Sequence, residues 1–159
     1  KRQGDELYFP EPGVVGRSLQ DPRRMVFPRI NPAVIGIIYL AGTNKILLAR
    51  NRMRSSFFSL IAGYVEPGES LEEAFAREAL EETGRRVHEV RYWGSQPWPP
   101  SGSLMMGFSA VTDDVQAVCD TDGELEEIRW ISRAELPELN IARKGSIAHT
   151  MIMEWYHGE

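Results

Sequence analysis

The strongest constraint on how this chain can fold is a helix that residues 70–83 predict. Ser70 is followed three residues later by Glu73, which is the pattern of a capping box at a helix N-terminus. The residues that follow include no Gly or Pro until Gly84 and are mostly good helix formers. Gly84 itself is typical of the position just after a helix, where the left-handed conformation is needed. Both ends of one helix are therefore marked in the sequence.

The C-terminal half of this helix carries three glutamates, Glu78, Glu81 and Glu82, in an unfavourable arrangement. At ~100° per residue they fall within an arc of roughly 100°. Each like-charged pair at i,i+3 or i,i+4 costs about 0.2–0.5 kcal/mol, and the helix dipole disfavours anions near this end. A solvated acidic face is the ordinary interpretation. The alternative is a site for a divalent cation, because carboxylate oxygens are the ligands that Mg²⁺ and Mn²⁺ prefer.

The spacing around the cluster favours the cation site. A glycine is followed after five residues by a glutamate, and after seven more by a run of the form REAxEExG. This pattern resembles the Nudix box, and its many fixed positions make it far more specific than a short glycine motif. The matching residues are Gly63, Glu69, Arg77, Glu78, Ala79, Glu81, Glu82 and Gly84. Arg85 departs from the pattern, because an aliphatic residue usually follows the last glycine.

The resemblance implies a metal-dependent hydrolase of nucleoside diphosphates linked to another moiety. Arg77 matches the arginine that orients the glutamates, and Glu82 or Glu81 matches the base that orients the attacking water. Bound Mg²⁺ or Mn²⁺ would neutralise the pyrophosphate and lower the pKa of that water, and a carboxylate can take its proton. Glu126 and Glu127 compete with Glu124 for the role of the downstream acidic ligand. The groups that match metal ligands are the main-chain carbonyl of Ala62 and the carboxylates of Glu78, Glu81, Glu82 and Glu124.

A second motif bears on the substrate. Residues 95–105 read SQPWPPSGSLM and resemble the SQPWPFPxS signature of NADH pyrophosphatases, with Pro100 and Ser101 in place of Phe and Pro. We expect a stiff loop, because prolines fix φ and reduce the entropy lost on ordering. The flat face of Trp98 can stack on a base, whereas a rigid turn with Trp98 packed in the core is the alternative. The resemblance implies substrate contacts from Gln96, Pro97, Trp98, Pro99, Pro100, Ser101, Gly102 and Ser103.

Three further residues match substrate contacts of the same subfamily: Phe27 in VFPR, Tyr64 in AGYVE, and Ala148 at the start of the final helix. An aromatic such as Tyr64 can stack on a base, which contributes ~1–3 kcal/mol in nucleic-acid complexes. Core packing explains Phe27 equally well. The three histidines, 88, 149 and 157, are scattered and are interpreted as surface or terminal-helix residues rather than ligands.

The resemblance also divides the chain at residue 30. Residues 1–30 are rich in Pro, Gly and Arg and predict loops and short strands. NADH pyrophosphatases usually carry a four-cysteine zinc ribbon there, but this chain has one cysteine, Cys119, and residues 21–24 (DPRR) occupy the place of a CxxC pair. The region is therefore interpreted as a degenerate, cysteine-free ribbon remnant that holds no zinc. Cys119 is expected to be a small, buried or half-buried side chain.

Residues 31–159 are predicted to form the Nudix hydrolase domain, of the α/β class, as an α/β/α sandwich with a mixed sheet. Strands are expected at 33–41, 45–50, 57–65, 86–94, 103–112 and 124–131. Ser132 and Glu135 predict the start of a short helix that Pro137 ends, and residues 146–156 predict a terminal helix with one apolar side.

Charge and hydropathy exclude several classes of protein. The net charge of −5 does not suit broad nucleic-acid or membrane binding. The longest apolar run, residues 33–41, is too short to span a bilayer. The start of the chain has no signal-peptide pattern, so a cytoplasmic location is expected. Because the chain begins with Lys rather than Met, it is expected to be a fragment.

The resemblance to NADH pyrophosphatases therefore implies hydrolysis of the pyrophosphate bond of NADH or NAD⁺ to nicotinamide mononucleotide and AMP. The same bond occurs in ADP-ribose, diadenosine compounds and NAD-capped RNA, which are alternative substrates; other long nucleic acids are not expected partners. A non-catalytic, nucleotide-sensing Nudix domain is the alternative from another class, and the unfavourable glutamate cluster argues against it. The resemblance further implies a homodimer whose sites borrow aromatics across the interface.

Overall fold

The computed structural model describes residues 4, 6–10, 15–54 and 56–158, and its packing divides the chain into two units, residues 1–30 and 31–159. The first unit contains a small antiparallel sheet of β1 (Leu7–Tyr8), β2 (Gly16–Ser18) and β3 (Met25–Val26). A turn closes at residues 21–24, because Arg24 N donates to Asp21 O (2.9 Å) and Arg23 N donates to the Asp21 carboxylate (3.1 Å).

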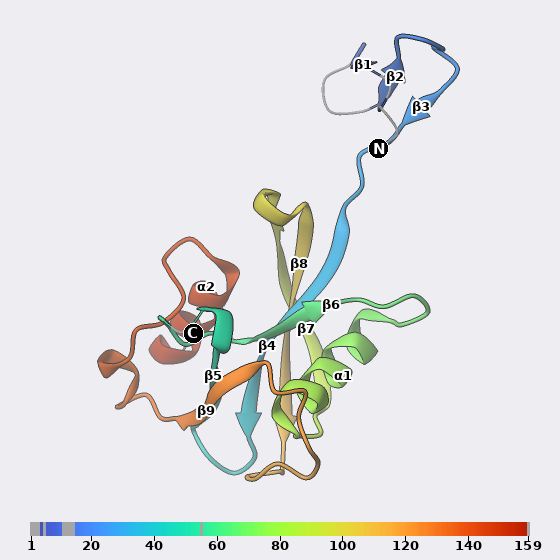
Figure 1. Cartoon of the computed structure of the whole chain (residues 1–159). Coiled ribbons are helices and arrows are strands. Elements are labelled where there is room, and N and C mark those ends of the chain that lie inside the picture. Colours follow the sequence, from blue (N-terminus) through green and yellow to red (C-terminus); the bar gives the residue numbers. More distant parts are fainter. Residues whose placement is uncertain (1–3, 5, 11–14, 55, 159) are drawn as a thin grey trace. The chain divides into compact units, whose positions relative to one another are not determined.

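The second unit is a mixed sheet covered by one helix on each face. Its strand order is β7-β8-β4-β5-β9, with β6 paired to β4; β4 and β8 run parallel and the other pairs antiparallel. Figure 1 shows the two helices on opposite sides of this sheet, which confirms the α/β/α sandwich. The strands are β4 (Asn31–Leu40), β5 (Ile46–Asn51), β6 (Ile61–Tyr64), β7 (His88–Trp98), β8 (Ser103–Thr112) and β9 (Leu125–Ile131), and the helices are α1 (Leu71–Thr83) and α2 (Ile147–His157).

The core lies in two layers on either side of β4. Successive side chains of a strand point to opposite faces, so Val34 and Ile38 pack under α1, whereas Ile35 and Ile37 pack under α2. Phe75 of α1 contributes to the first layer, where its ring stacks on that of Phe108 at 5.9 Å between centroids. A strand covered on both faces requires a nearly continuous apolar run, which is what the sequence of β4 contains. Among the residues that the structure describes, no helix has both the length and the apolarity to cross a membrane.

Helix α1 confirms the predicted boundaries to within one residue. Ser70 Oγ accepts from Glu73 N, and the Glu73 carboxylate accepts from Ser70 N at 2.8 Å, which completes the capping box. Gly84 ends the helix with φ 69° and donates to Leu80 O at 2.8 Å.

Arg85, the departure from the box, is buried although it is charged. Its guanidinium donates to Thr83 O (2.7 Å) and Val115 O (3.0 Å) and lies 5.5 Å from the centre of the Trp130 ring. The side chain thus fills the interior position of an aliphatic residue and anchors the 113–124 loop, and the next strand begins only at His88.

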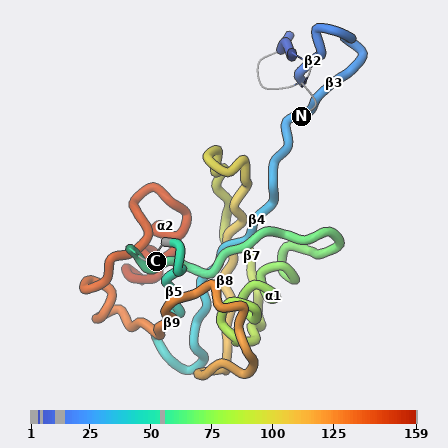
Figure 2. The backbone as a smooth tube through the Cα atoms, in the orientation of Figure 1, coloured from blue at the N-terminus to red at the C-terminus, as the bar shows by residue number. Residues whose placement is uncertain are grey.

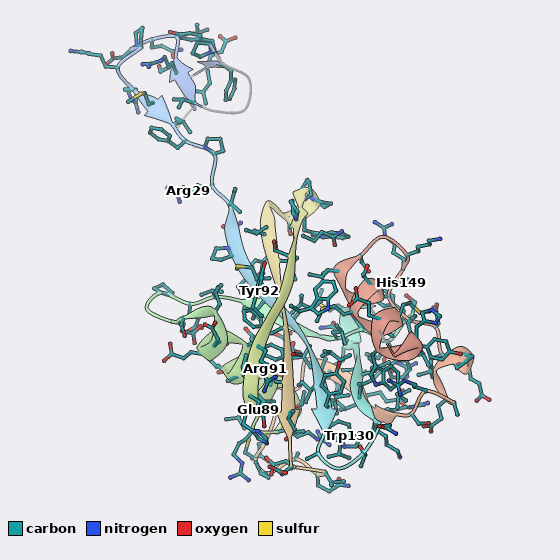
Figure 3. All side chains as sticks on the ribbon, turned by 180° about the vertical axis from the view of Figure 1, so that it is seen from behind. Arg29, Glu89, Arg91, Tyr92, Trp130 and His149 are labelled. Atoms are coloured by element: carbon teal, nitrogen blue, oxygen red, sulfur yellow. The ribbon has the colours of Figure 1, made fainter. Side chains whose placement is uncertain are left out.

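The expected loop at residues 95–103 is wrong. Strand β7 continues to Trp98 beside β8, with Gln96 opposite Met105 and Trp98 opposite Ser103, and a 3₁₀ turn (η2, Pro99–Ser101) closes the hairpin. Figure 2 shows the two strands side by side along this hairpin. Pro97 is tolerated because β7 is the edge strand, where a missing N–H need not break the ladder. In Figure 3, Glu89, Arg91 and Tyr92 follow this edge.

Three smaller expectations also need correction. The strand expected at 57–65 is regular only over β6, because Phe58 and Ser59 make isolated bridges to Ile141 and Ala49 instead. Pro137 lies in the first turn of a 3₁₀ helix (η3, Leu136–Glu138) rather than ending a helix, since a first-turn residue needs no N–H partner. Cys119 is exposed, because it lies in the loop between β8 and β9 and not under a sheet face. The fold also includes one 3₁₀ turn after β5 (η1, Arg52–Arg54).

Candidate active site beside helix α1

Arg77 connects the loop before α1 to the glutamate face of the helix. Its Nε and Nη2 donate to the two carboxylate oxygens of Glu69 at 2.6 and 3.0 Å. Its Nη1 donates to Glu78 (3.0 Å) and Glu81 (2.9 Å), and Nη2 also reaches Tyr64 O at 2.9 Å. These carboxylates, Glu69 above all, raise the pKa of Arg77. Glu69, which had no predicted role beyond its place in the box, is therefore the main partner of the arginine.

Glu82 is in a very different environment from its neighbour Glu81. It is only 6% exposed, and its carboxyl group has a pKa raised to about 8, with burial as the largest cause. The nearby charges of Glu78, Asp122 and Glu124 contribute to this increase in pKa, whereas a backbone hydrogen bond from Ala62 opposes it. A buried carboxylate surrounded by like charges is costly when ionised. This is the electrostatic signature of a functional group rather than of a stabilising one.

Glu78 lies against the backbone of β6. Burial is the largest cause that raises the pKa of its carboxyl group, and the ion pair with Arg77 lowers it only in part. A Cβ atom on Gly63 would lie 2.0 Å from the Glu78 carboxyl carbon, so only glycine permits this approach. Glu81 is half exposed and directed to Arg77. The helix thus presents Glu78 and Glu82 to the sheet and leaves Glu81 at the surface.

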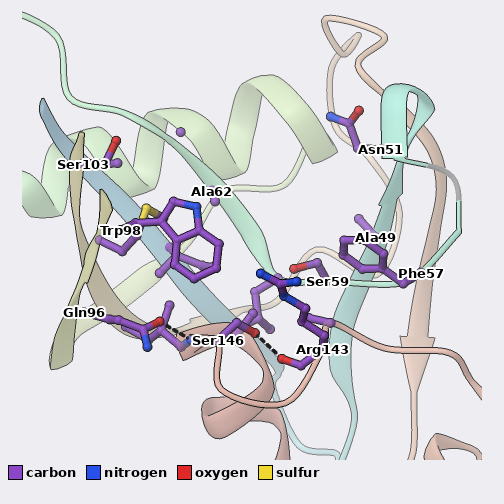
Figure 4. Close-up of a pocket in the computed structure, with 18 of the residues that line it drawn as sticks. Ala49, Asn51, Phe57, Ser59, Ala62, Gln96, Trp98, Ser103, Arg143 and Ser146 are labelled. Carbon is purple, nitrogen blue, oxygen red and sulfur yellow. Dashed lines mark hydrogen bonds between the residues drawn. The ribbon is translucent and has the colours of Figure 1, made fainter. Parts of the chain in front are cut away.

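A pocket of about 680 Å³ opens next to Glu82, between the β7–β8 hairpin, β6 and the loop before α2. Figure 4 shows how Trp98, Gln96 and Ser103 form one side of it. Pockets of this size and mixed character typically hold small molecules. The predicted site residues that line it are Ala62, Tyr64, Glu82, Gln96, Trp98, Ser101, Ser103 and Ala148.

Other predicted site residues lie outside the lining. Four of them belong to the β7–β8 hairpin but do not line the cavity: Pro97, Pro99, Pro100 and Gly102. Four charged residues near the pocket also do not line it: Arg77, Glu78, Glu81 and Glu124. Phe27 is 61% exposed and belongs to the 1–30 unit. None of the three histidines lines the pocket. His88 and His157 are exposed, and His149 lies on α2 (Figure 3).

The hairpin end of the pocket combines hydroxyl groups with aromatic faces. Ser101 Oγ and Ser103 Oγ are 2.8 Å apart, and Ser103 Oγ donates to Tyr64 Oη at 3.5 Å. Trp98 is half-buried in the pocket wall rather than packed in the core. Such a surface can receive a planar base and the hydroxyl groups of a ribose.

The Gln96 side chain is engaged by the chain itself. Its Nε2 donates to Gly145 O at 2.9 Å, and its Oε1 accepts from Ile147 N at 2.7 Å. Both polar ends of the carboxamide are thus used to hold the loop before α2 against β7. Gln96 shapes the pocket by positioning its opposite wall.

Several lining residues were missed by the sequence reasoning. They come from β5, from the segment before β6, from β8 and from the loop before α2, which no sequence spacing connects to the Nudix box. Only the position of Arg143, in the run IARKGSIA just before Ala148, could have drawn attention to it. The missed residues include Asn51, Phe57, Ser59, Met105, Arg143 and Ser146.

The donor groups of the site fit a hard divalent cation. Glu78 and Glu82 supply carboxylate oxygens next to the Ala62–Gly63 backbone, and Asp122 and Glu124 add negative charge around Glu82. Oxygen donors with excess negative charge are what Mg²⁺ and Mn²⁺ bind. Within the described residues, however, no three acidic, histidine or cysteine side chains are grouped closely enough to surround one ion. One Glu78 oxygen is taken by Arg77 in this arrangement.

Two proteins with related sequences cover more than two thirds of this chain. The NAD-capped RNA hydrolase NudC of Mycobacterium bovis is 46% identical over 110 residues, covering 69% of this chain and 35% of that protein. The human NAD-capped RNA hydrolase NUDT12 is 35% identical over 150 residues, covering 87% of this chain and 32% of that protein. The chain thus spans about a third of the length of these relatives.

Solved structures share the fold. A crystal structure of a NUDIX hydrolase from Nitrosomonas europaea matches with a TM-score of 0.69 at 27% identity, covering 99% of this chain and 89% of that one. The NUDIX domain family matches residues 30–151, which include α1, its glutamates and all of the pocket lining. The chain belongs to the NUDIX domain family.

Proposed function

We propose that this chain hydrolyses the pyrophosphate bond of a nicotinamide dinucleotide, NADH or NAD⁺, to nicotinamide mononucleotide and AMP. The observation that carries the proposal is the carboxyl group of Glu82, which is 6% exposed and lines a pocket large enough for a nucleotide. A carboxylate in this position can orient a water molecule and accept its proton. Among the residues that the structure describes, Glu82 has no ion pair that would stabilise this position.

The cofactor in this proposal is Mg²⁺ or Mn²⁺, held by Glu78 and Glu82 with the Ala62 carbonyl and Glu124 and with Glu81 in support. When bound, it would neutralise phosphate charge and lower the pKa of the attacking water. Glu82 orients that water and accepts its proton as the water oxygen attacks phosphorus and the bridging oxygen leaves. Glu81 is the weaker candidate for this base, because it is half exposed and bonded to Arg77. Arg77 positions Glu78 through their 3.0 Å ion pair.

The hairpin end of the pocket is proposed to hold one nucleoside of the substrate. Trp98 and Tyr64 offer aromatic faces, Ser101 and Ser103 offer hydroxyl groups, and Ala148 leaves room on the α2 side. The prolines of η2 keep this end rigid. Phe27 stays a predicted contact from the 1–30 unit.

A second candidate substrate is RNA that carries an NAD cap. The printed names of the relatives from Mycobacterium bovis and human favour it. The scissile bond is the same, so the chemistry assigned to Glu82 does not change. The two substrates differ only in the chain attached to the adenosine ribose.

The test is an LC–MS measurement of the products of pyrophosphate cleavage with Mg²⁺ and with Mn²⁺. These are nicotinamide mononucleotide, in reduced form from NADH, together with AMP or, from capped RNA, the 5′-phosphorylated oligonucleotide. Substrates are NADH, NAD⁺, an NAD-capped oligonucleotide, ADP-ribose and diadenosine polyphosphate. Wild type is compared with Glu82→Gln and with Glu72→Gln, a matched change at an exposed position of the same helix. We expect turnover to be lost in the first variant and retained in the second. A higher kcat/KM for ADP-ribose than for NADH would reject the proposed substrate, and NADH binding without AMP release would support a sensing domain.

We further propose that residues 1–30 are a zinc-ribbon remnant without zinc and that the protein is a homodimer. The small sheet of β1–β3, with a turn at residues 21–24, supports the first proposal. Zinc content after purification would test it, and elution mass in solution would test the second.

A further inference from the structure

The pocket lining contains one cation. Of the described residues that line it, only Glu82 and Arg143 carry a formal charge. Arg143 lies in the loop between η3 and α2, on the wall facing the β7–β8 hairpin. In Figure 4 its side chain extends from this loop into the pocket, whereas its carbonyl turns away to Ser146.

The Arg143 guanidinium makes no hydrogen bond or ion pair with the described residues of the chain. Most other arginines in the domain do: Arg50 pairs with Glu127 at 2.7 Å, Arg77 with Glu78 at 3.0 Å and Arg86 with Asp114 at 2.9 Å. In an acidic domain with many available carboxylates, an arginine left without one is free to bind an anion. Its donors are directed at the space that the substrate is proposed to occupy.

The loop that carries Arg143 is held in place on both sides. Before it, Phe58 N donates to Asn140 O and Ala142 N donates to Phe58 O, each at 2.8 Å. After it, Ser146 N and Oγ both donate to Arg143 O, and Gln96 bonds the backbone on either side of Ser146. A preorganised backbone reduces the entropy that ordering the side chain on a ligand costs.

We propose that Arg143 binds a phosphate group of the substrate and so determines which pyrophosphate-linked compounds this pocket prefers. The inference rests on the proposed function. A guanidinium matches phosphate oxygens with paired, charge-assisted hydrogen bonds. It also supplies the positive charge that the acidic end of the pocket lacks. The phosphate has two sources: the pyrophosphate itself, or a further phosphate on the adenosine ribose, as in NADPH or in capped RNA.

Steady-state kinetics with Arg143→Gln, Arg143→Lys and Lys144→Gln test this proposal. Lys144 is the matched control, because it is the next residue, exposed and outside the lining. We expect Arg143→Gln to raise KM by roughly tenfold or more, as loss of a hydrogen bond to a charged group does, with kcat within about twofold. Arg143→Lys should recover part of the loss, and Lys144→Gln should behave as wild type.

The substrates distinguish the two sources of phosphate. An equal rise in KM for NADH, NADPH and an NAD-capped oligonucleotide assigns Arg143 to the pyrophosphate. A rise confined to NADPH or the capped oligonucleotide assigns it to the additional phosphate. KM of the wild type should also increase with KCl more steeply than KM of Arg143→Gln, because salt screens the charge pair. Equal KM values for Arg143→Gln and Lys144→Gln with all three substrates would overturn the proposal.

A binding measurement separates failure of this inference from failure of the proposed function. Adenosine, AMP, adenosine 2′,5′-bisphosphate and adenosine 3′,5′-bisphosphate contain no pyrophosphate bond and are titrated calorimetrically into wild type and Arg143→Gln. At least one phosphate in this series should increase the affinity of wild type, and the variant should lose that increase. If both proteins gain affinity equally from every phosphate, Arg143 does not bind phosphate, whether or not the wild type hydrolyses NADH.

Discussion

Helices α1 and α2 cover opposite faces of the same sheet, start at serine caps of the same kind, and differ in what their buried sides contain. Under α2 the side chains are apolar: Met151, Ile152 and Trp155 pack in the core. Under α1, Phe75 and two alanines are followed by the buried carboxyl group of Glu82. Packing accounts for the buried side of α2, whereas the buried side of α1 includes a carboxyl group whose burial works against stability. The comparison teaches that a buried residue points to function when it is ionisable, because burying a charge is unfavourable.

The largest expected effect is loss of turnover when the α1 carboxylate is neutralised. Glu82→Gln keeps the shape of the side chain but removes the base, so kcat should fall by about 10²–10⁴-fold. LC–MS detection of AMP release measures it. Turnover within threefold of wild type would show that Glu82 is not the catalytic base. The buried side of α1 would then have no demonstrated catalytic role, like that of α2.

The same variant should be more stable than wild type, with a characteristic dependence on pH. The folded pKa of Glu82 is about 8, above the ordinary value of 4.5. Between these values the folded state holds a proton that the unfolded state has lost, so the stability of wild type falls as pH rises through this window. Glu82→Gln does not titrate, and its advantage in unfolding free energy should grow from near zero at pH 4 to at most about 5 kcal/mol at pH 9. Urea unfolding in EDTA at pH 5, 7 and 9 measures it; parallel curves for the two proteins would contradict the assigned pKa.

A substitution in the buried side of α2 should lower stability and leave turnover nearly unchanged, the opposite of Glu82→Gln in α1. Ile152 is fully buried under α2, and Ile152→Ala should cost about 2–5 kcal/mol of unfolding free energy through lost burial and a cavity. Turnover per folded molecule should change by less than about threefold. Thr150→Ala, at an exposed position of the same helix, serves as the control. If turnover falls by more than the loss of folded protein explains, α2 contributes to catalysis and not only to packing.

Gly63→Ala tests the contact between α1 and β6. The new Cβ would lie 2.0 Å from the Glu78 carboxyl carbon, so Glu78 must move away from the site. We expect kcat to fall by about 10²-fold, as misplacement of a site group by about 1 Å can cause. Gly94→Ala is the matched control, since its Cβ would meet no atom within 4 Å. Equal activities would show that the position of Glu78 does not matter.

The smallest expected effect concerns the connection from β7 to α2. Gln96→Leu removes both hydrogen bonds to the loop before α2. KM should rise by roughly fivefold to tenfold with little change in kcat, because the wall of the pocket loosens while the carboxylates stay in place. Hydrogen exchange at residues 143–147 should accelerate in the variant. Unchanged exchange together with a raised KM would instead indicate direct substrate contact by Gln96.

The elements that were predicted well are those whose signals are local. Helix α1 is set by a serine cap, a run of helix formers and a terminal glycine, all within one segment. The extension of β7 to Trp98 was missed because prolines usually interrupt strands, and only the sheet shows that this strand lies at an edge. Pro137 was misplaced for a similar reason, since a proline both ends helices and starts them.

The sequence alone determined that three glutamates share one side of a capped helix and that an arginine accompanies them, because side chains three and four residues apart meet on any helix. Only the tertiary structure decided that Glu82 is buried and Glu81 half exposed, that Glu69 holds Arg77, and that Arg143 faces the same pocket. The reason is physical. Helical spacing specifies direction around an axis, whereas desolvation and the neighbouring charges that set a pKa depend on what the sheet and distant loops place there.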